Sequence, residues 1–160
     1  PLKADIEVHL PNGVGARFTL IDVHLKAGID GSDAARRQEA LARLKNFADD
    51  LQTATPDVGV MIVGDFNDSP ADAASDNVFT PFLDDPSQYA ILTLPLAQAD
   101  EYSYIPYPSL LDHIIVTTSL AAGGFADILE LDEQITAFDY EDQVSDHRPV
   151  VSILPMVPMR

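Results

Sequence analysis

The first third of the chain alternates apolar and polar residues in the way that half-buried β-strands do. In ADIEVHLPNGVGARFTLIDVHL, the alternation over residues 6–10 predicts one strand, and the Pro-Asn-Gly turn at 11–13 leads into a second strand over Phe18–Leu25. Both faces of the second strand are largely apolar, which indicates burial on both sides. Asp22 and His24 then need a reason to lie in that strand.

One long helix is predicted to follow, from Ser32, which can cap its amino end, to about Gln52. Its apolar stripe consists of Leu41, Leu44, Phe47, Ala48 and Leu51, and its polar positions include Arg36, Arg37, Arg43 and Lys45. Pro56 stops it. The continuous apolar run VGVMIVG, residues 58–64, predicts a central strand covered on both faces.

The second half of the chain is predicted to be rich in loops before it returns to strands. Within residues 70–110 a short helix is predicted over Ala71–Phe82, and the rest is broken by Pro81, Pro86, Pro95, Pro106 and Pro108. Strands are predicted within 110–118 and 125–133, and a buried strand at 150–154. No repeat or linker divides the chain, so the pattern predicts one domain with a mostly β core and one strong helix packed on it.

The composition fits a single globular domain. Of the 160 residues, 46% are hydrophobic and 22% are charged, which is neither disordered nor membrane-like. No apolar run approaches the roughly 18 residues that cross a bilayer, so no membrane span is predicted. The absence of cysteine excludes disulfides and thiolate zinc sites. With the acidity described next, it leans weakly towards a secreted or periplasmic protein and leaves the compartment open.

The charge is strongly unbalanced, with 26 acidic residues against 9 Lys and Arg and a net charge of −17. Such a surface repels polyanions, and the sequence has no basic stripe of the kind that binds nucleic acid tightly. The acidity suits solubility, a cation requirement, or a small phosphate substrate held through a metal.

Four segments place a chemically useful side chain where an apolar strand begins or ends. They are IDVHL with His24, IVGDFND with Asp65 and Asn67, SLLDHIIVT with Asp112, and SDHRPVV with Asp146 and His147. Strand ends form one rim of a sheet, so these groups are predicted to converge there.

Each segment also has a plainer interpretation. Asp65 and Asn67 lie on one side if their strand continues, but both residues also favour turns. His24 alone is more commonly a satisfied core histidine, and Asp112 is equally well a strand-entry carboxylate. The acidic tract ELDEQITAFDYED, residues 130–142, is predicted to be a solvated surface.

A calcium-binding loop is a further alternative for the second segment. Asp65, Asn67 and Ser69 mimic the ligand spacing of such a loop. Pro70 stands where that loop needs glycine, and Asp76 stands where it needs glutamate. An acidic calcium-binding protein is therefore the least favoured interpretation.

Taken together, the side chains suit one chemistry better than others. The sequence has no cysteine and no serine in a nucleophile-elbow context, which disfavours acyl transfer. Carboxylates are ligands for Mg²⁺, an Asp-held His is a general base or acid, and Asn can donate to a phosphoryl oxygen. The set predicts metal-assisted hydrolysis of a phosphoester.

The motifs DVHL, GDFND, LLDHIIVT and SDHRPVV, in this order and with the helix RRQEALARL between the first two, resemble the endonuclease/exonuclease/phosphatase superfamily. The likeness extends from about Ile6 to Leu154. It implies an α/β fold of two packed, mostly antiparallel β-sheets flanked by helices, a four-layer sandwich.

The resemblance also implies roles for the side chains of the last two motifs. His147 would be the general base or acid and Asp112 would orient it. Asp146 would bind the catalytic divalent ion, Mg²⁺ or alternatively Mn²⁺ or Ca²⁺. The substrate would be a phosphoester of a nucleic acid, a phospholipid head group or a sugar phosphate.

Roles for the first two motifs follow in the same way. Asp65 would orient or deprotonate the attacking water, Asn67 would stabilise the transition state, and His24 would contact the scissile phosphate. Asp22 departs from the family, because many relatives have Asn there. The tyrosines of DEYSYIPYPSLL either stack on a base or sugar, or simply pack their own loop.

A second departure concerns the start of the domain. The family has an N-terminal half with an Asn in its first strand and a metal-binding Glu, and nothing in this sequence matches them. Residues 1–160 are therefore predicted to be one partial domain whose unpaired sheet edges invite another chain or the missing half. The alternative function is an inactive or truncated member that serves as a binding or assembly module.

Overall fold

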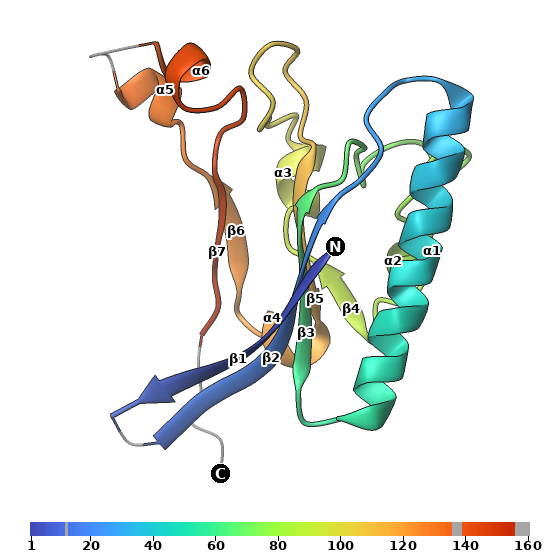
Figure 1. The fold of residues 1–160 in the computed structure, drawn as a ribbon, viewed down its shortest axis with the longest axis vertical. Helices are drawn as coiled ribbons and strands as arrows, with labels where there is room; N and C mark the ends of the chain where they lie inside the picture. Colours follow the sequence, from blue (N-terminus) through green and yellow to red (C-terminus); the bar gives the residue numbers. More distant parts are fainter. Residues whose placement is uncertain (12, 136–138, 156–160) are drawn as a thin grey trace.

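Two β-sheets and one long helix make up the fold in the computed structural model, which describes residues 1–11, 13–135 and 139–155. A five-stranded sheet has the order β1-β2-β3-β5-β4, and β6 and β7 form a second sheet (Figure 1). The strands are β1 Leu2–Leu10, β2 Gly13–His24, β3 Gly59–Asp65, β4 Tyr89–Ile91, β5 Asp112–Thr117, β6 Phe125–Ile128 and β7 Val150–Ile153. The helices are α1 Gly31–Ala54, α2 Thr80–Leu83, α3 Leu94–Gln98, α4 Thr118–Ala121, α5 Leu131–Gln134 and α6 Tyr140–Gln143.

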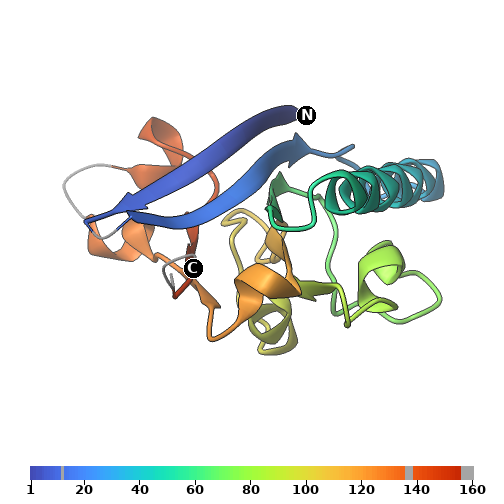
Figure 2. The same ribbon diagram turned by 90° about the horizontal axis from the view of Figure 1, so that it is seen from below.

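The pairing of the strands follows from their connections. β2 and β3 are parallel because α1 crosses over between them, and every other pair is antiparallel. Seen from below, α1 lies beside one face of the five-stranded sheet (Figure 2). The predicted α/β class, with two sheets and flanking helices, is confirmed. No helix in the described ranges is long and apolar enough to cross a bilayer.

The main core lies between the five-stranded sheet and α1. It contains Ile21 and Val23 from β2 and Leu41 and Leu44 from α1, together with Phe66 after β3. Burying a side chain of this size contributes about 1.5–3 kcal/mol. The predicted stripe of α1 is therefore correct at Leu41, Leu44 and Ala48, whereas Phe47 is 44% exposed.

A smaller core joins the opposite face of that sheet to the second sheet. Met61, Ile114 and Val116 are buried there, and Val150 and Leu154 pack against them. β7 is therefore a one-sided strand, since Ile153 is 59% exposed, and the prediction of a fully buried strand at 150–154 is wrong.

β2 is also buried on one face only. Val23 and Ile21 are buried against the helix layer, whereas Asp22 and His24 are exposed on the other face. Burial on both sides was therefore a wrong prediction for β2, because the second sheet covers the β3–β5 side of this face and leaves part of the β2 side open. His24 is not a core histidine, since its side chain is 74% exposed.

Several element boundaries also differ from the prediction. Asp30, not Ser32, is the residue before the first helical residue of α1. The helix predicted over Ala71–Phe82 is confined to α2, because Asn77 uses its side chain to close turns over 70–79 instead. β6 ends at Ile128. Asn12 of the predicted turn lies outside the described residues.

Gly64 permits the close approach of β2 and β3. Its φ is +130°, and a Cβ at this position would stand 1.9 Å from the carbonyl oxygen of Val23. Only glycine adopts this conformation without strain. The residue therefore sets the path of β3 directly before Asp65.

Candidate active site

Three of the predicted site residues form one row across the sheet. His24 on β2 pairs with Asp65 on β3, and Asp65 pairs with Asp112 on β5. Residues in register on neighbouring strands point to the same face. This face is the one that the second sheet partly covers, so the convergence expected from the four strand ends is present for these three residues.

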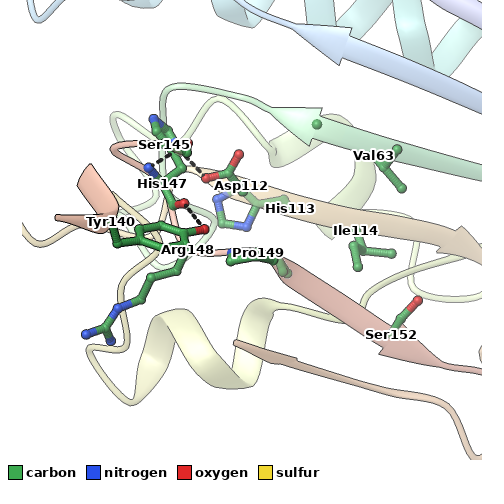
Figure 3. A pocket seen from close by; sticks show the side chains of 12 residues that line it. Val63, Asp112, His113, Ile114, Tyr140, Ser145, His147, Arg148, Pro149 and Ser152 are labelled. Atoms are coloured by element: carbon green, nitrogen blue, oxygen red, sulfur yellow. Dashed lines mark hydrogen bonds and ion pairs between the residues drawn. The ribbon is translucent and has the colours of Figure 1, made fainter. Parts of the chain in front are cut away.

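Asp112 and His147 form the closest side-chain pair of the site. His147 Nδ1 lies 2.6 Å from Asp112 Oδ2, and the two side chains are 24% and 23% exposed (Figure 3). Asp112 starts β5, while His147 follows a turn in which Ser145 Oγ accepts the backbone N–H of His147 over 3.0 Å. Because the carboxylate only accepts, Nδ1 carries the proton and Nε2 is left for other partners.

Asp65 lies beside both histidines of the site. His24 Nε2 is 3.4 Å from Asp65 Oδ2. Burial raises the pKa of Asp65, and the negative charge of Asp112 raises it further. The backbone N–H of Asn67 and the nearby His147 and His24 act in the opposite direction. Asp65 is therefore a carboxyl group whose proton affinity is above the ordinary range for aspartate.

Asn67 is placed by a turn and not by a continuing strand. β3 ends at Asp65, whose Oδ1 accepts the Asn67 backbone N–H over 2.8 Å. Asn67 has a φ of +54°, a left-handed conformation that asparagine tolerates well. The turn interpretation of GDFND is thus correct, and the same turn delivers the amide: Nδ2 donates to the carbonyl of Leu25 over 3.3 Å.

Asp146 differs from the other predicted residues, because in the part of the chain that the structure describes no side-chain hydrogen bond or ion pair joins it to them. It is exposed, and its backbone carbonyl accepts the N–H of Ile105 over 2.9 Å. Across residues 1–11, 13–135 and 139–155, no group of three or more His, Cys, Asp and Glu side chains is arranged to hold a metal ion. The residues present therefore do not by themselves make a complete metal site, and Asp146 offers one carboxylate.

Arg148 is a structural residue, although it is adjacent to His147. Its guanidinium points away from the Asp112–His147 pair (Figure 3). It lies 4.1 Å from the ring centroid of Tyr102. Its nitrogens contact carboxylate oxygens of Glu130 at 3.2 Å, Asp132 at 2.9 Å and Glu133 at 2.8 Å.

The acidic tract is exposed, as predicted, at Glu130, Glu133, Gln134, Asp139, Glu141 and Asp142, and three of its carboxylates also contact Arg148. Arg148 is only 2% exposed, so a buried cation requires these carboxylates as partners. Residues 136–138 of the tract lie outside the described residues. The tract holds the strand that follows His147 in place.

A pocket of about 520 Å³ lies between the two sheets beside the pair (Figure 3). It is lined by Val63, Asp112 and Ile114 from the large sheet and by His147, Val150 and Ser152 from the segment that ends in β7. The pocket is thus polar at the end that holds the pair and apolar along the strands.

One tyrosine of the proline-rich loop lies beside His147, and a second lies beside that tyrosine. The ring centroid of Tyr104 is 5.0 Å from that of His147. The ring centroid of Tyr107, which is 78% exposed, is 6.4 Å from that of Tyr104. Tyr102 packs under Arg148 instead. Tyr102 therefore packs against a buried side chain, whereas Tyr104 and Tyr107 form an aromatic surface beside the site.

The loops that carry the row are held by buried polar groups that the sequence did not single out. Arg37, predicted among the polar positions of α1, is 5% exposed and donates to the carbonyls of Lys26 and Gly28 and to the carboxylate of Asp68. His113 contacts Thr93 Oγ1 through Nδ1 and the Asp68 carbonyl through Nε2. Burial lowers the pKa of His113 to about 4, so this imidazole is neutral.

Two packed sheets with an Asp–His pair at their shared rim agree with the family to which the chain belongs. Residues 15–148 match the model of the Endonuclease/Exonuclease/phosphatase family. A comparison with curated protein sequences found no significant match.

Solved structures agree on the fold. The 3'-5' exonuclease NExo from Neisseria meningitidis has a TM-score of 0.62 and 20% identity, over 94% of this chain and 64% of that one. Truncated Caenorhabditis elegans TDP2 has a TM-score of 0.61 and 12% identity, over 94% and 65%. The mannosyl-6-phosphatase Bt3783 of Bacteroides thetaiotaomicron has a TM-score of 0.55 and 16% identity, over 89% and 52%. The chain thus spans between about half and two thirds of the length of these structures.

Proposed function

We propose that this chain takes part in the hydrolysis of phosphoester bonds, with His147 as general base or acid. The observation that supports the proposal most is the 2.6 Å contact between His147 Nδ1 and Asp112 Oδ2 at the end of the row of site residues. An imidazole held in this way transfers protons near neutral pH.

The proton transfer would use the free nitrogen of the imidazole. With Nδ1–H donated to Asp112, Nε2 can take a proton from a water molecule as its oxygen attacks phosphorus. In the opposite assignment, Nε2–H protonates the leaving oxygen as the P–O bond breaks. In both cases the Asp112 carboxylate stabilises the charged imidazolium.

The other residues of the row would act on water and on the phosphoryl group. Asp65 would orient the attacking water. Its carboxylate lies 3.4 Å from His24 Nε2, and the nearby charge of His147 acts to lower its pKa. Asn67 has one amide hydrogen committed to Leu25, and its second can be donated to a phosphoryl oxygen. His24, which is largely exposed, would contact the phosphate.

The proposed cofactor is Mg²⁺, or alternatively Mn²⁺ or Ca²⁺. Mg²⁺ is commonly held by one or two carboxylates, water and substrate phosphate. Asp146 would supply one carboxylate, and water and substrate phosphate oxygens would complete the coordination, since the described residues contain no group of three or more such side chains arranged around a metal. Such an ion neutralises the charge that develops on the phosphoryl oxygens.

The substrate class is a phosphoester of a nucleic acid, a phospholipid head group or a sugar phosphate. Structurally similar proteins include one described as a 3' phosphatase bound to product DNA and one described as a mannosyl-6-phosphatase. The net charge of −17 disfavours tight binding of duplex nucleic acid unless a cation screens it.

The test is hydrolysis of bis-p-nitrophenyl phosphate with Mg²⁺ and with EDTA. It would use this chain and a version extended at its amino end by the preceding coding sequence, if there is one. We expect Mg²⁺-dependent turnover that His147→Ala abolishes and that His9→Ala leaves intact, since His9 is exposed on β1. Turnover that survives His147→Ala would refute the assignment.

The second candidate function is a binding or assembly module. Two observations favour it: the described residues do not complete a metal site, and the second sheet has only two strands. A two-stranded sheet is marginal by itself, and the apolar face that carries Ile6, Phe18 and Leu20 is only partly covered. Pairing with another chain or with an N-terminal half would complete both.

This second candidate predicts a clear mass difference in solution. Analytical ultracentrifugation should show self-association of this chain, or a stable complex when an N-terminal half is co-expressed. A well-folded monomer that hydrolyses phosphoesters without any added segment would rule it out.

A further inference from the structure

A fully buried serine lies directly behind the Asp112–His147 pair. Ser103 is 0% exposed, and its Oγ donates to Asp112 Oδ2 over 2.6 Å. The same Oγ accepts the backbone N–H groups of Leu111 and Asp112, each over 3.2 Å. Because its lone pairs face these N–H groups, the hydroxyl proton is directed at the carboxylate.

The backbone of Ser103 holds the other partner of the pair. Its carbonyl accepts the N–H of Arg148 over 2.7 Å, and Ile105 donates to the carbonyl of Asp146 over 2.9 Å. Tyr104 and His147 face each other between these two bonds as an antiparallel bridge. Residues 103–105 therefore act as a short template strand for residues 146–148.

We propose that Ser103 is a positioning residue for the proton transfer assigned to His147, a proposal that rests on the proposed function. Asp112 Oδ2 receives both the Ser103 hydroxyl and His147 Nδ1. The serine thereby prevents the carboxylate from rotating towards solvent, to which the Asp112 side chain is 23% exposed. The imidazole keeps its Nδ1–H form, with Nε2 directed to the substrate.

A purely structural role would be different in kind. A serine that only fills buried space would affect stability, and the remaining folded protein would bind and react normally. A positioning role affects the chemical step, because misplacement of a proton-transfer group by about 1 Å lowers the rate about 100-fold. A structural role therefore predicts a loss of thermal stability. A positioning role predicts a lower kcat with little change in KM.

The experiment compares Ser103→Ala, which removes the hydroxyl, with Ser103→Thr, which restores it. Ser87→Ala is the matched control, because the exposed Ser87 also donates its Oγ–H to an aspartate, Asp85. Steady-state kinetics on bis-p-nitrophenyl phosphate and thermal melting are measured for each variant. Long-range ¹H–¹⁵N spectra of the imidazole rings, above the pH at which histidine titrates, report the His147 tautomer, which is assigned with His147→Gln.

We expect Ser103→Ala to lower kcat at least about tenfold with KM within twofold, and to convert His147 from one tautomer to a mixture. Ser103→Thr should restore both, and Ser87→Ala should change neither. A single unchanged tautomer in Ser103→Ala would overturn the proposal, as would loss of kcat that Ser103→Thr does not repair while the tautomer is retained. If Ser103→Ala fails to fold, the kinetics and the His147 tautomer are measured in Ser103→Thr instead. A tautomer mixture in that variant, which keeps the hydroxyl, would overturn the proposal.

The tautomer does not depend on turnover. If the wild-type chain shows no hydrolysis, the proposed function fails while the spectra still test the contact between Ser103 and the pair.

Discussion

Arg37 Nε donates to Asp68 Oδ2 over 2.7 Å, and both side chains are almost fully buried. Through the same guanidinium, α1 also holds the carbonyls of Lys26 and Gly28, which follow His24. One cation thus fixes the loop after β2 and the loop after β3, the two loops next to His24 and Asn67.

Removal of this cation should destabilise the protein strongly. Arg37→Met leaves the buried Asp68 carboxylate without its charged partner, which costs about 3–5 kcal/mol. Chemical denaturation would measure the loss. Arg36→Met, on the exposed neighbour, is the control and should stay within about 0.5 kcal/mol of wild type. The double variant Arg37→Met with Asp68→Asn should recover part of the loss; equal stability of Arg37→Met and wild type would contradict the buried pair.

Addition of one methyl group at Gly64 should be as damaging. A Cβ there meets the Val23 carbonyl at 1.9 Å, and the φ of +130° is strained for alanine. We expect Gly64→Ala to lose about 3 kcal/mol or more, or to fail to fold. Gly31→Ala is the matched control, because a Cβ at Gly31 meets nothing within 4 Å. Equal melting temperatures for the two variants would show that β2 and β3 do not approach as described.

The loop after Asn67 should respond to pH through Asp72. Partial removal from water, followed by the hydrogen bond and charge of Asp68, raises the pKa of Asp72 from 3.8 to about 6. The folded chain then binds this proton more tightly than the unfolded chain, so the contribution of Asp72 is complete below about pH 4 and is lost as the pH rises through about 6. Because Asp72 is exposed, the effect should be below about 1 kcal/mol.

The measurement is the difference in unfolding free energy between wild type and Asp72→Asn across this range. Asp72→Asn should gain stability relative to wild type between pH about 4 and about 6 and keep a constant difference above it. Asp127→Asn, at an exposed position on β6, supplies the control. A constant difference throughout the range would contradict the raised pKa.

Neutralising the carboxylate behind the imidazole should reduce turnover without unfolding the chain. Asp112→Asn keeps the shape of the side chain, but its amide can present a donor to His147 Nδ1 and favour the wrong tautomer. We expect kcat to fall about 10²- to 10⁴-fold, with Asp127→Asn as the unaffected control. Full activity of Asp112→Asn would remove the pair from the mechanism.

Metal binding should depend on Asp146. Calorimetric titration with Mg²⁺, Mn²⁺ and Ca²⁺ should show weaker binding by Asp146→Asn than by wild type, because one carboxylate ligand is lost. Asp142→Asn, which neutralises an exposed aspartate of α6, should bind as wild type does. EDTA should abolish turnover in the active form. Ca²⁺ binding that Asp146→Asn leaves unchanged would favour an acidic calcium-binding protein instead.

The sequence predicted the strands and the long helix because their patterns are local. The apolar run before Asp65 and the stripe around Leu41 depend on neighbours in the chain. It overestimated the burial of β2, because burial of a second face depends on what covers it from elsewhere in the fold. The apolar side chains around His24 gave no indication that the histidine is open to solvent.

For the candidate site, the sequence predicted that several strand-end residues converge but did not predict the groups that support them. His24 and Asp65 end conspicuous strands and Asp112 begins one, so their convergence was predictable from the ends of those strands. Ser103 is a serine among tyrosines in a proline-rich loop, and nothing local marks its contact with Asp112. The same is true of Arg37, whose helical position resembles that of its exposed neighbour. Long-range contacts of this kind are not encoded in periodicity.

The candidate site depends on the register of three strands, because that register places His24, Asp65 and Asp112 in one row. Neighbouring strands lie about 4.8 Å apart, so the three backbone positions span about 10 Å across the sheet. A slip of β3 by one residue would turn Asp65 towards the helix layer and bring Gly64 or Phe66 into the row. Such a misaligned chain could still bury most of its apolar side chains while losing the contacts that Asp65 makes in the candidate site. Correct pairing of β3 is therefore a condition for the proposed activity. If β3 pairs in the wrong register, we expect a folded but inactive fraction of the protein.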